Sequence, residues 1–243
     1  MVIEVLLLVV AAFLVGYAKT SIGGLASISI AIFASVMPAK ESTAAILLLL
    51  ITGDVVAVWK YRRHADWALL RRLVPSVLPG LALGAGFLAV VDDTVLRRSI
   101  GVLLFVMAAL QLALQWRSPD TSVVARSRPA ALGTGLAAGF TTMTANAAGS
   151  VMTLYLVARG VEKSRFLGTG ALFFFGVNLC KIPFSAGLGL FTTATLQRTV
   201  LLVPFVLLGT WAGLHTARRL SQARFNQAVL AATVVSAIAL VVR

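Results

Sequence analysis

The stretch Gly16-Tyr-Ala-Lys-Thr-Ser-Ile-Gly-Gly24 interrupts an apolar segment that runs from about residue 2 to residue 37. It brings a cation, two hydroxyls and two adjacent glycines to one place. Glycine costs about 1 kcal/mol relative to alanine inside a helix, so the Gly23-Gly24 pair predicts a break. Inside a membrane, non-helical backbone is tolerated only where protein buries it or where it lines a wet cavity, and a charge such as Lys19 needs a partner or a ligand. The stretch therefore predicts an anion site within a membrane.

The composition is that of an integral membrane protein built of helices. Of the 243 residues, 59% are hydrophobic and 12% are charged, whereas soluble domains are about half apolar and about a quarter charged. The apolar residues form long runs instead of short alternating strands, which favours helices over a β-barrel. The single cysteine, Cys180, excludes an internal disulfide. Neither a metal site nor a cofactor is expected.

The net charge of +13 is concentrated in loops between the apolar runs. Basic residues cluster at 60–72, 117–128, 159–165 and 218–224. This pattern is typical of cytoplasmic loops that set membrane topology, and no basic face interleaved with aromatic residues is present. The expected surroundings are therefore a lipid bilayer and not a nucleic acid, and no soluble domain points to a protein partner.

Two of the expected helical segments are long and interrupted. The apolar segments cover approximately 2–37, 42–59, 73–91, 95–115, 130–158, 166–187, 196–214 and 225–242. The first and fifth exceed the ~20 residues that span a bilayer, and the fifth is interrupted at Thr141-Thr-Met-Thr-Ala-Asn-Ala-Ala-Gly149. Long interrupted segments in corresponding positions indicate an internal duplication, which is typical of transporters.

The duplication divides the chain into a first membrane repeat (1–116), a cytoplasmic linker (117–129) and a second membrane repeat (130–243). Gly16 corresponds to Gly139, and Gly24 corresponds to Gly149 after a two-residue insertion. The stretch from Pro79 to Gly84 corresponds to the stretch from Pro204 to Gly209 at a constant offset of 125 residues.

Charge bias predicts that the two repeats are inverted. The basic loop 60–72 is expected in the cytoplasm, whereas its uncharged counterpart at 188–196 is expected outside. The inversion follows if segments 1 and 5 are re-entrant hairpins, so that each repeat has three crossings and both termini lie outside. The basic flanks of segment 5, at 117–128 and 159–165, support this arrangement. The alternative is eight full spans with a cytoplasmic N-terminus.

The two breaks are expected to meet near the membrane midplane and to hold the anion. Helix N-termini there would direct free N–H groups and the positive end of the helix dipole at it. The candidate binding residues are Lys19, Thr20, Ser21, Gly23 and Gly24 at the first break, and Thr142, Thr144, Asn146 and Gly149 at the second. The alternative for any one hydroxyl is a bond to its own backbone four residues back, and for any one glycine it is helix packing.

Three further polar residues lie within later spans. Asp54 is in the second segment, and Asn178 and Lys181 share one face of the sixth because they are three residues apart. We add Asn178 and Lys181 to the anion site and consider Asp54 the candidate for carrying a coupling proton. The repeat alignment also places Asp54 almost opposite Lys181, so these two could instead neutralise each other.

The motifs at both breaks resemble the TauE/SafE family of sulfite exporters, over essentially the whole chain. The matching stretches are Gly16–Gly24, Gly139-Phe-Thr-Thr-Met143, Asn146-Ala-Ala-Gly149, Tyr155-Leu156, Phe166-Leu-Gly-Thr169 and Asn178-Leu-Cys-Lys-Ile-Pro183. The resemblance implies a bacterial inner-membrane permease that moves small sulfur-containing anions, such as sulfite or organosulfonates, outward. Members often carry Gly-x-Gly-Gly-Gly at the first break. This chain has Thr20-Ser-Ile-Gly-Gly24 there, a difference that bears on the choice of anion.

The prediction is an all-α integral membrane transporter, with two inverted repeats that rock around an anion held between the broken segments. An enzyme is not expected, because the sequence has no Ser-His-Asp arrangement, no His-Glu-x-x-His motif and no paired carboxylates. A channel would share the broken helices and the hydroxyls that line a pore. An anion channel, or a permease for a different small anion, is therefore the alternative.

Overall fold

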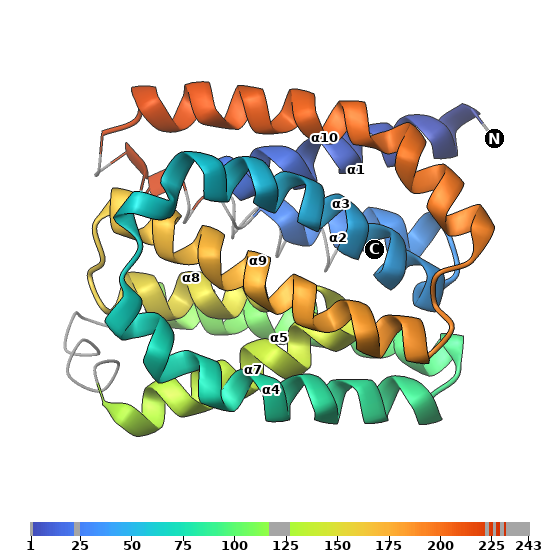
Figure 1. Ribbon diagram of the computed structural model, residues 1–243, viewed down its shortest axis with the longest axis horizontal. Helices are drawn as coiled ribbons and strands as arrows, with labels where there is room; N and C mark the ends of the chain where they lie inside the picture. Colours follow the sequence, from blue (N-terminus) through green and yellow to red (C-terminus); the bar gives the residue numbers. More distant parts are fainter. Residues whose placement is uncertain are drawn as a thin grey trace.

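The computed structural model describes residues 2–21, 25–116 and 127–221, together with 224–225, 227–228 and 231. Regular structure in this part of the chain is entirely helical, and Figure 1 shows the helices as a bundle with roughly aligned axes. The helices are α1 (Val2–Thr20), α2 (Ala26–Val36), α3 (Ala39–Tyr61), α4 (Trp67–Val90), α5 (Asp93–Trp116), α7 (Arg128–Ala145), α8 (Ala148–Ala158), α9 (Lys163–Gly187) and α10 (Thr193–Arg219), with a 3-10 turn at Arg62–His64. The last expected segment, 225–242, lies almost entirely outside the described residues.

Five of these helices are long and apolar enough to cross a membrane. They are α1, α3, α4, α9 and α10. The helices α2 and α8 are also apolar but have only 11 residues each, which at a rise of about 1.5 Å per residue covers roughly half of a hydrocarbon core. The all-helical membrane protein expected from the composition is confirmed.

Both long apolar segments are broken where the sequence predicts. The first break separates α1 from α2, and Gly23 and Gly24, to which we attributed it, lie outside the described residues. At the second break, Asn146 takes the left-handed conformation with a φ of 53°, which asparagine tolerates better than most residues. The N–H groups of Asn146 and Ala147 then bond to carbonyls in the last turn of α7, so the helix ends cleanly.

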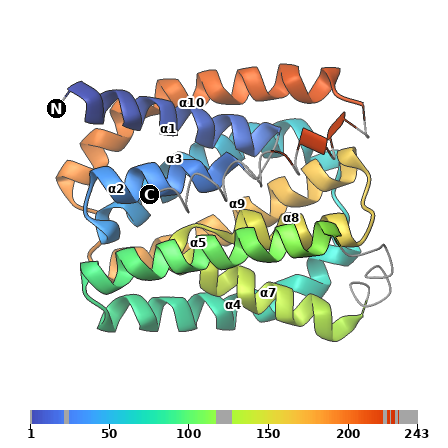
Figure 2. The ribbon, with the colours of Figure 1, turned by 180° about the vertical axis from the view of Figure 1, so that it is seen from behind.

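The short helix after each break turns back beside the long one before it. Figures 1 and 2 show α2 running back along α1, and α8 running back along α7. As a result, the start of α1 and the end of α2 lie at one end of the bundle. The start of α7 and the end of α8 lie at the other end.

Basic residues are distributed unequally between the two ends. The end that holds the α3–α4 and α8–α9 connections, at the left of Figure 1, is strongly basic. The basic residues at or next to it are Lys60, Arg62, Arg63, Arg71, Arg72, Arg128, Arg159, Lys163, Arg165, Arg218 and Arg219. The opposite end holds the α4–α5 and α9–α10 connections and carries charges of both signs, including Glu41, Asp92, Asp93 and Arg198.

Glycines allow the backbones of α1 and α10 to touch. A Cβ at Gly16 would overlap the carbonyl oxygen of Val206, and one at Gly209 would overlap that of Phe13. Small residues at a crossing are the usual way for helices in a membrane to approach closely. The long arm of the first broken segment is therefore anchored on a helix from the second half of the chain.

The same kind of contact joins α7 to α4. A Cβ at Gly139 would overlap the carbonyl oxygen of Val77, and one at Gly80 would overlap that of Leu136. The long arm of the second broken segment is thus anchored on a helix from the first half. The two halves are interleaved and do not form separate bodies.

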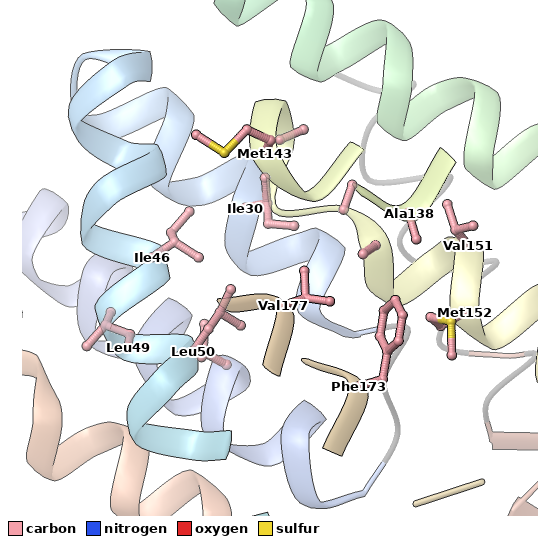
Figure 3. Packing of buried hydrophobic residues seen from close by; sticks show 14 of the residues in the cluster. Ile30, Ile46, Leu49, Leu50, Ala138, Met143, Val151, Met152, Phe173 and Val177 are labelled. Carbon is pink, nitrogen blue, oxygen red and sulfur yellow. The ribbon is translucent and has the colours of Figure 1, made fainter. Parts of the chain in front are cut away.

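The buried apolar core surrounds the two breaks. Figure 3 shows Leu50 of α3 and Val177 of α9 among side chains that come from α2, α7 and α8. Because every helix that carries a predicted site residue contributes to this core, the core fixes the positions of the polar groups described below.

Candidate functional site

A cavity of about 60 Å³ lies between the two breaks. About 10–15 Å³ of such space holds one water molecule, so the cavity has room for several waters or a small ligand. It is lined by groups from both broken segments and from α3 and α9. The predicted site residues in its lining are Lys19, Ser21, Asp54, Thr142, Asn146, Gly149 and Asn178.

The N-terminal ends of α2 and α8 meet at this cavity. Ala26 begins α2, Gly149 lies in the first turn of α8, and both line the cavity. The hydroxyl oxygens of Ser27 and Ser150 lie 3.2 Å apart across the contact. Unsatisfied N–H groups and a partial positive charge collect at such helix ends. Two of them facing one cavity favour a negatively charged occupant.

The sequence motifs did not single out Ser27 and Ser150. They are 123 residues apart, whereas the offset between the repeats is 125 residues from Gly24 and Gly149 onward, so the repeat alignment pairs Ser27 with Met152 and not with Ser150. The hydroxyls were overlooked because a serine within an apolar helix is usually bonded to its own backbone.

A buried ion pair occupies one wall of the cavity. The Lys19 ammonium nitrogen lies 2.6 Å from Oδ1 of Asp54, and the two side chains are 8% and 0% exposed. The second carboxylate oxygen accepts a hydrogen bond of 2.7 Å from the Asn178 amide. The ammonium also lies 4.6 Å from the centre of the Phe174 ring, close enough for a cation–π interaction. Asp54 thus pairs with Lys19 and not with Lys181, the partner that the repeat alignment suggested.

Lys181 is fully buried behind the second break and does not line the cavity. Its ammonium donates to the side-chain oxygen of Asn146 and, over 3.4 Å, to the hydroxyl of Thr142. The Asn146 amide donates in turn to the Thr43 carbonyl oxygen over 3.1 Å. Lys181 therefore ties the turn between α7 and α8 to α9, and the same turn is tied to α3. Asn146 and Thr142, which accept hydrogen bonds from its ammonium, are the residues that connect Lys181 to the cavity lining.

Two predicted hydroxyls serve the fold. Thr20 donates to the Thr210 carbonyl oxygen over 2.9 Å, while the Tyr61 hydroxyl donates to the Thr20 carbonyl oxygen, also over 2.9 Å. Thr144 donates over 2.9 Å to Phe140, four residues back in its own helix. Neither threonine lines the cavity. For these two residues the structure favours the backbone-bonding alternative.

Ser21 is different, because its hydroxyl has no partner within the described part of the chain. The residue is 1% exposed and lines the cavity. Burying a hydroxyl without a hydrogen bond is costly. A buried donor beside Lys19 that no described residue satisfies is available for a ligand.

The charges at this site do not cancel. Lys19 and Lys181 are cationic and Asp54 is anionic, so two positive charges and one negative charge leave a net charge of +1 when all three are ionised. Among the described residues, no group of three histidine, cysteine or acidic side chains could hold a metal ion. An excess of positive charge beside a cavity favours an anion over a cation as its occupant.

Comparison with protein-family models gave a match over residues 8–240 to a family described as Sulfite exporter TauE/SafE. Comparisons with curated proteins and with solved structures gave no match. The matched range includes both breaks and every described residue that lines the cavity.

Proposed function

This chain belongs to the TauE/SafE family of sulfite exporters, and we propose that it carries a small sulfur-containing anion, such as sulfite or an organosulfonate, outward across a bacterial inner membrane. Family membership makes the chain a membrane transporter of the anion-exporting kind. The choice of anion, its location and the mechanism of transport are the parts that we propose.

The observation that carries the proposal is the cavity between the two breaks. It combines the Lys19 ammonium, the unpartnered Ser21 hydroxyl and the N-terminal ends of α2 and α8. Each of these groups stabilises negative charge, and burial strengthens all of them. We propose that the anion sits among them, with Thr142, Asn146, Gly149 and Asn178 also lining the site. Lys181, Thr20 and Thr144 support this site from behind.

The volume of the cavity bears on the choice of anion. At about 60 Å³ it fits a compact oxyanion such as sulfite in the conformation described. The apolar part of the lining, which includes Leu50, Met152 and Phe166, is where the carbon chain of an organosulfonate would lie.

We further propose that the chain consists of two inverted repeats, 1–116 and 130–243, joined by a cytoplasmic linker at 117–129. The fold-back of α2 on α1 and of α8 on α7 supports re-entrant hairpins that enter from opposite sides. The strongly basic end of the bundle matches the cytoplasmic side, because cytoplasmic loops are enriched in lysine and arginine. The N-terminus then lies outside.

Transport on this proposal is alternating access around a fixed site. The anion lies where the two repeats meet, and the interleaved pairs α1–α10 and α4–α7 are candidates for bodies that rock against each other. Asp54, which lies in the cavity wall, is the candidate for carrying a coupling proton. The protonation state of Asp54 would then determine on which side of the membrane the anion is released.

The test compares anion binding by the purified protein with binding by the double variant Lys19→Met/Asp54→Asn. Both partners of the ion pair are changed together because removing one would leave a buried unpaired charge, which is strongly destabilising. Sulfite, sulfoacetate, sulfate and chloride are added in turn, and thermal stabilisation and calorimetry report binding. We expect stabilisation by sulfite that the double variant lacks.

The matched control is Glu41→Gln/Arg198→Met, which removes the more exposed ion pair between α3 and α10, 3.9 Å apart. This variant should bind sulfite as the unchanged protein does. If none of the four anions stabilises the protein, or if the Lys19/Asp54 double variant binds equally well, the proposed site is wrong. Flux of sulfite into liposomes separates the alternatives, because a carrier saturates with concentration whereas an open channel does so far less readily.

A further inference from the structure

We infer that Asp54 competes with the transported anion for the Lys19 ammonium, so that protonation of Asp54 opens the site to the anion. The inference rests on the proposed function, since it concerns the same cavity. It goes further by assigning how a proton and an anion are linked there.

The geometry places the Asp54 carboxylate where an oxyanion would be expected to bind. The carboxylate lines the cavity, lies 2.6 Å from the Lys19 ammonium and accepts from the Asn178 amide over 2.7 Å. A sulfite ion presents the same kind of group, with negatively charged oxygens that accept hydrogen bonds. The Asp54 carboxylate therefore already occupies the position beside Lys19 that an incoming anion needs.

An anion that enters while Asp54 is ionised meets a like charge in a buried space. Among the described residues, the charged groups that act on Asp54 are Lys19 from α1 and Lys181 from α9. Lys181 is held by Asn146 and Thr142 behind the second break, so it does not replace Lys19 as a partner in this arrangement. Protonation of Asp54 removes the like charge and releases the Lys19 ammonium for the anion.

The charge count agrees with this exchange. With Asp54 ionised the three groups carry a net charge of +1, and with Asp54 protonated they carry +2. One proton on Asp54 therefore prepares the site for one further negative charge. The Ser21 hydroxyl lines the same cavity and has no partner among the described residues, so it can donate a hydrogen bond to the incoming anion.

A thermodynamic consequence follows. If the anion binds only to the form with a proton on Asp54, its affinity falls tenfold per pH unit at pH values where Asp54 is ionised, by linkage. One proton is then taken up for each anion that binds while Asp54 is ionised.

The experiment measures the dissociation constant of sulfite across the neutral pH range for the unchanged protein and for Asp54→Asn. Sulfite itself titrates in this range, but identically for both proteins, so the ratio of the two constants reports on Asp54 alone. We expect the variant to bind more tightly at high pH, with a ratio that grows by up to tenfold per pH unit, and the two proteins to converge at low pH.

The control is Asp92→Asn, which removes an exposed carboxylate at the start of α5, where asparagine can still cap the helix. This variant should follow the unchanged protein at every pH. A second variant, Asn178→Ala, keeps the ion pair but removes the hydrogen bond that favours the ionised carboxylate. It should move the fall in affinity to higher pH, and it serves as the test if Asp54→Asn does not fold.

A constant ratio across the pH range overturns the inference, as does weaker binding by Asp54→Asn at every pH. An unmoved pH profile in Asn178→Ala has the same meaning. In each of these cases the unchanged protein still binds sulfite, so the proposed function stands. If the unchanged protein binds no sulfite at any pH, the proposed function fails and the inference fails with it.

Discussion

At the residue scale, the polar side chains at the breaks fall into two groups that look alike in the sequence. Ser21 and Lys19 face the cavity, whereas the neighbouring Thr20 bonds to a carbonyl of α10. Thr20 is the last residue of α1 and Ser21 lies in the turn after it, so the two side chains do not follow one helical periodicity. The sequence predicts that such a cluster is functional, but it does not give the residue at which the helix ends, which decides which member faces the ligand.

The pairing of Lys19 with Asp54 is another feature that the sequence does not reveal. Both residues were predicted to matter because charges inside a span are rare and costly. Their contact depends on the packing of α1 against α3. The repeat alignment pointed to Lys181 because it relates equivalent positions of the two repeats, and equivalent positions need not touch each other.

Replacing Ser21 with alanine should weaken sulfite binding by about tenfold or more, because a hydrogen bond to a charged group is worth roughly 1.5–3 kcal/mol. Stability without the anion should be unchanged or slightly higher, since a buried hydroxyl without a described partner is removed. Calorimetry with sulfite and thermal unfolding check the two parts. The matched control is Ser185→Ala, which removes another buried and unpartnered hydroxyl, away from the cavity. Equal affinities for all three proteins would contradict a role for Ser21 in binding.

At the element scale, both breaks could be predicted because each long apolar segment exceeds one span and carries glycine and small polar residues near its middle. The residue that makes the second turn could not. Asn146 takes the left-handed conformation, whereas Gly149 lies within the first turn of α8. The amide of Asn146 explains the choice, because it accepts from Lys181 and donates to the Thr43 carbonyl. Glycine would supply the turn without these bonds.

The glycine contacts between helices lead to a stability prediction within α7. Gly139→Ala should destabilise the protein by about 1–3 kcal/mol or more, because the new methyl group would meet the backbone of α4 at Val77. Gly133→Ala, in the same helix, should be neutral or stabilising by up to about 1 kcal/mol, because nothing lies within 4 Å of the added Cβ and alanine favours helix. Unfolding in mixed detergent micelles gives both values. Equal stabilities for the two variants would show that α7 and α4 do not touch at Gly139.

At the scale of the whole molecule, the interleaving of the two halves has a physical reason. A helix that turns back halfway cannot bury its own polar break, because a lone hairpin would expose that backbone to lipid. Packing the long arm of each hairpin on a helix of the other half encloses both breaks in one interior. The sequence predicts the two hairpins and their similarity to each other. The helix on which each hairpin packs is determined by contacts such as that of Gly16 with Val206, which the periodicity of the sequence does not reveal.

The membrane topology supplies the last prediction. In a Cys180→Ser background, which removes the exposed native thiol, single cysteines replace Arg128 and Glu162 on the two flanks of the α7–α8 hairpin. Both positions are exposed at the basic end of the bundle. A re-entrant hairpin requires a membrane-impermeant maleimide to label both from the cytoplasmic side only. Asp92→Cys, at the opposite end, should be labelled only from outside.

The alternative topology of eight full spans predicts a different labelling result, because a segment that crosses the membrane completely puts residues 128 and 162 on opposite sides. Labelling of these two cysteines from different sides would therefore rule out the hairpin and, with it, the inversion of the repeats. Labelling of both from the outside would keep the hairpin but reverse the orientation of the bundle. That outcome would contradict the assignment of the arginine-rich end to the cytoplasm, which rests on the tendency of basic loops to stay inside.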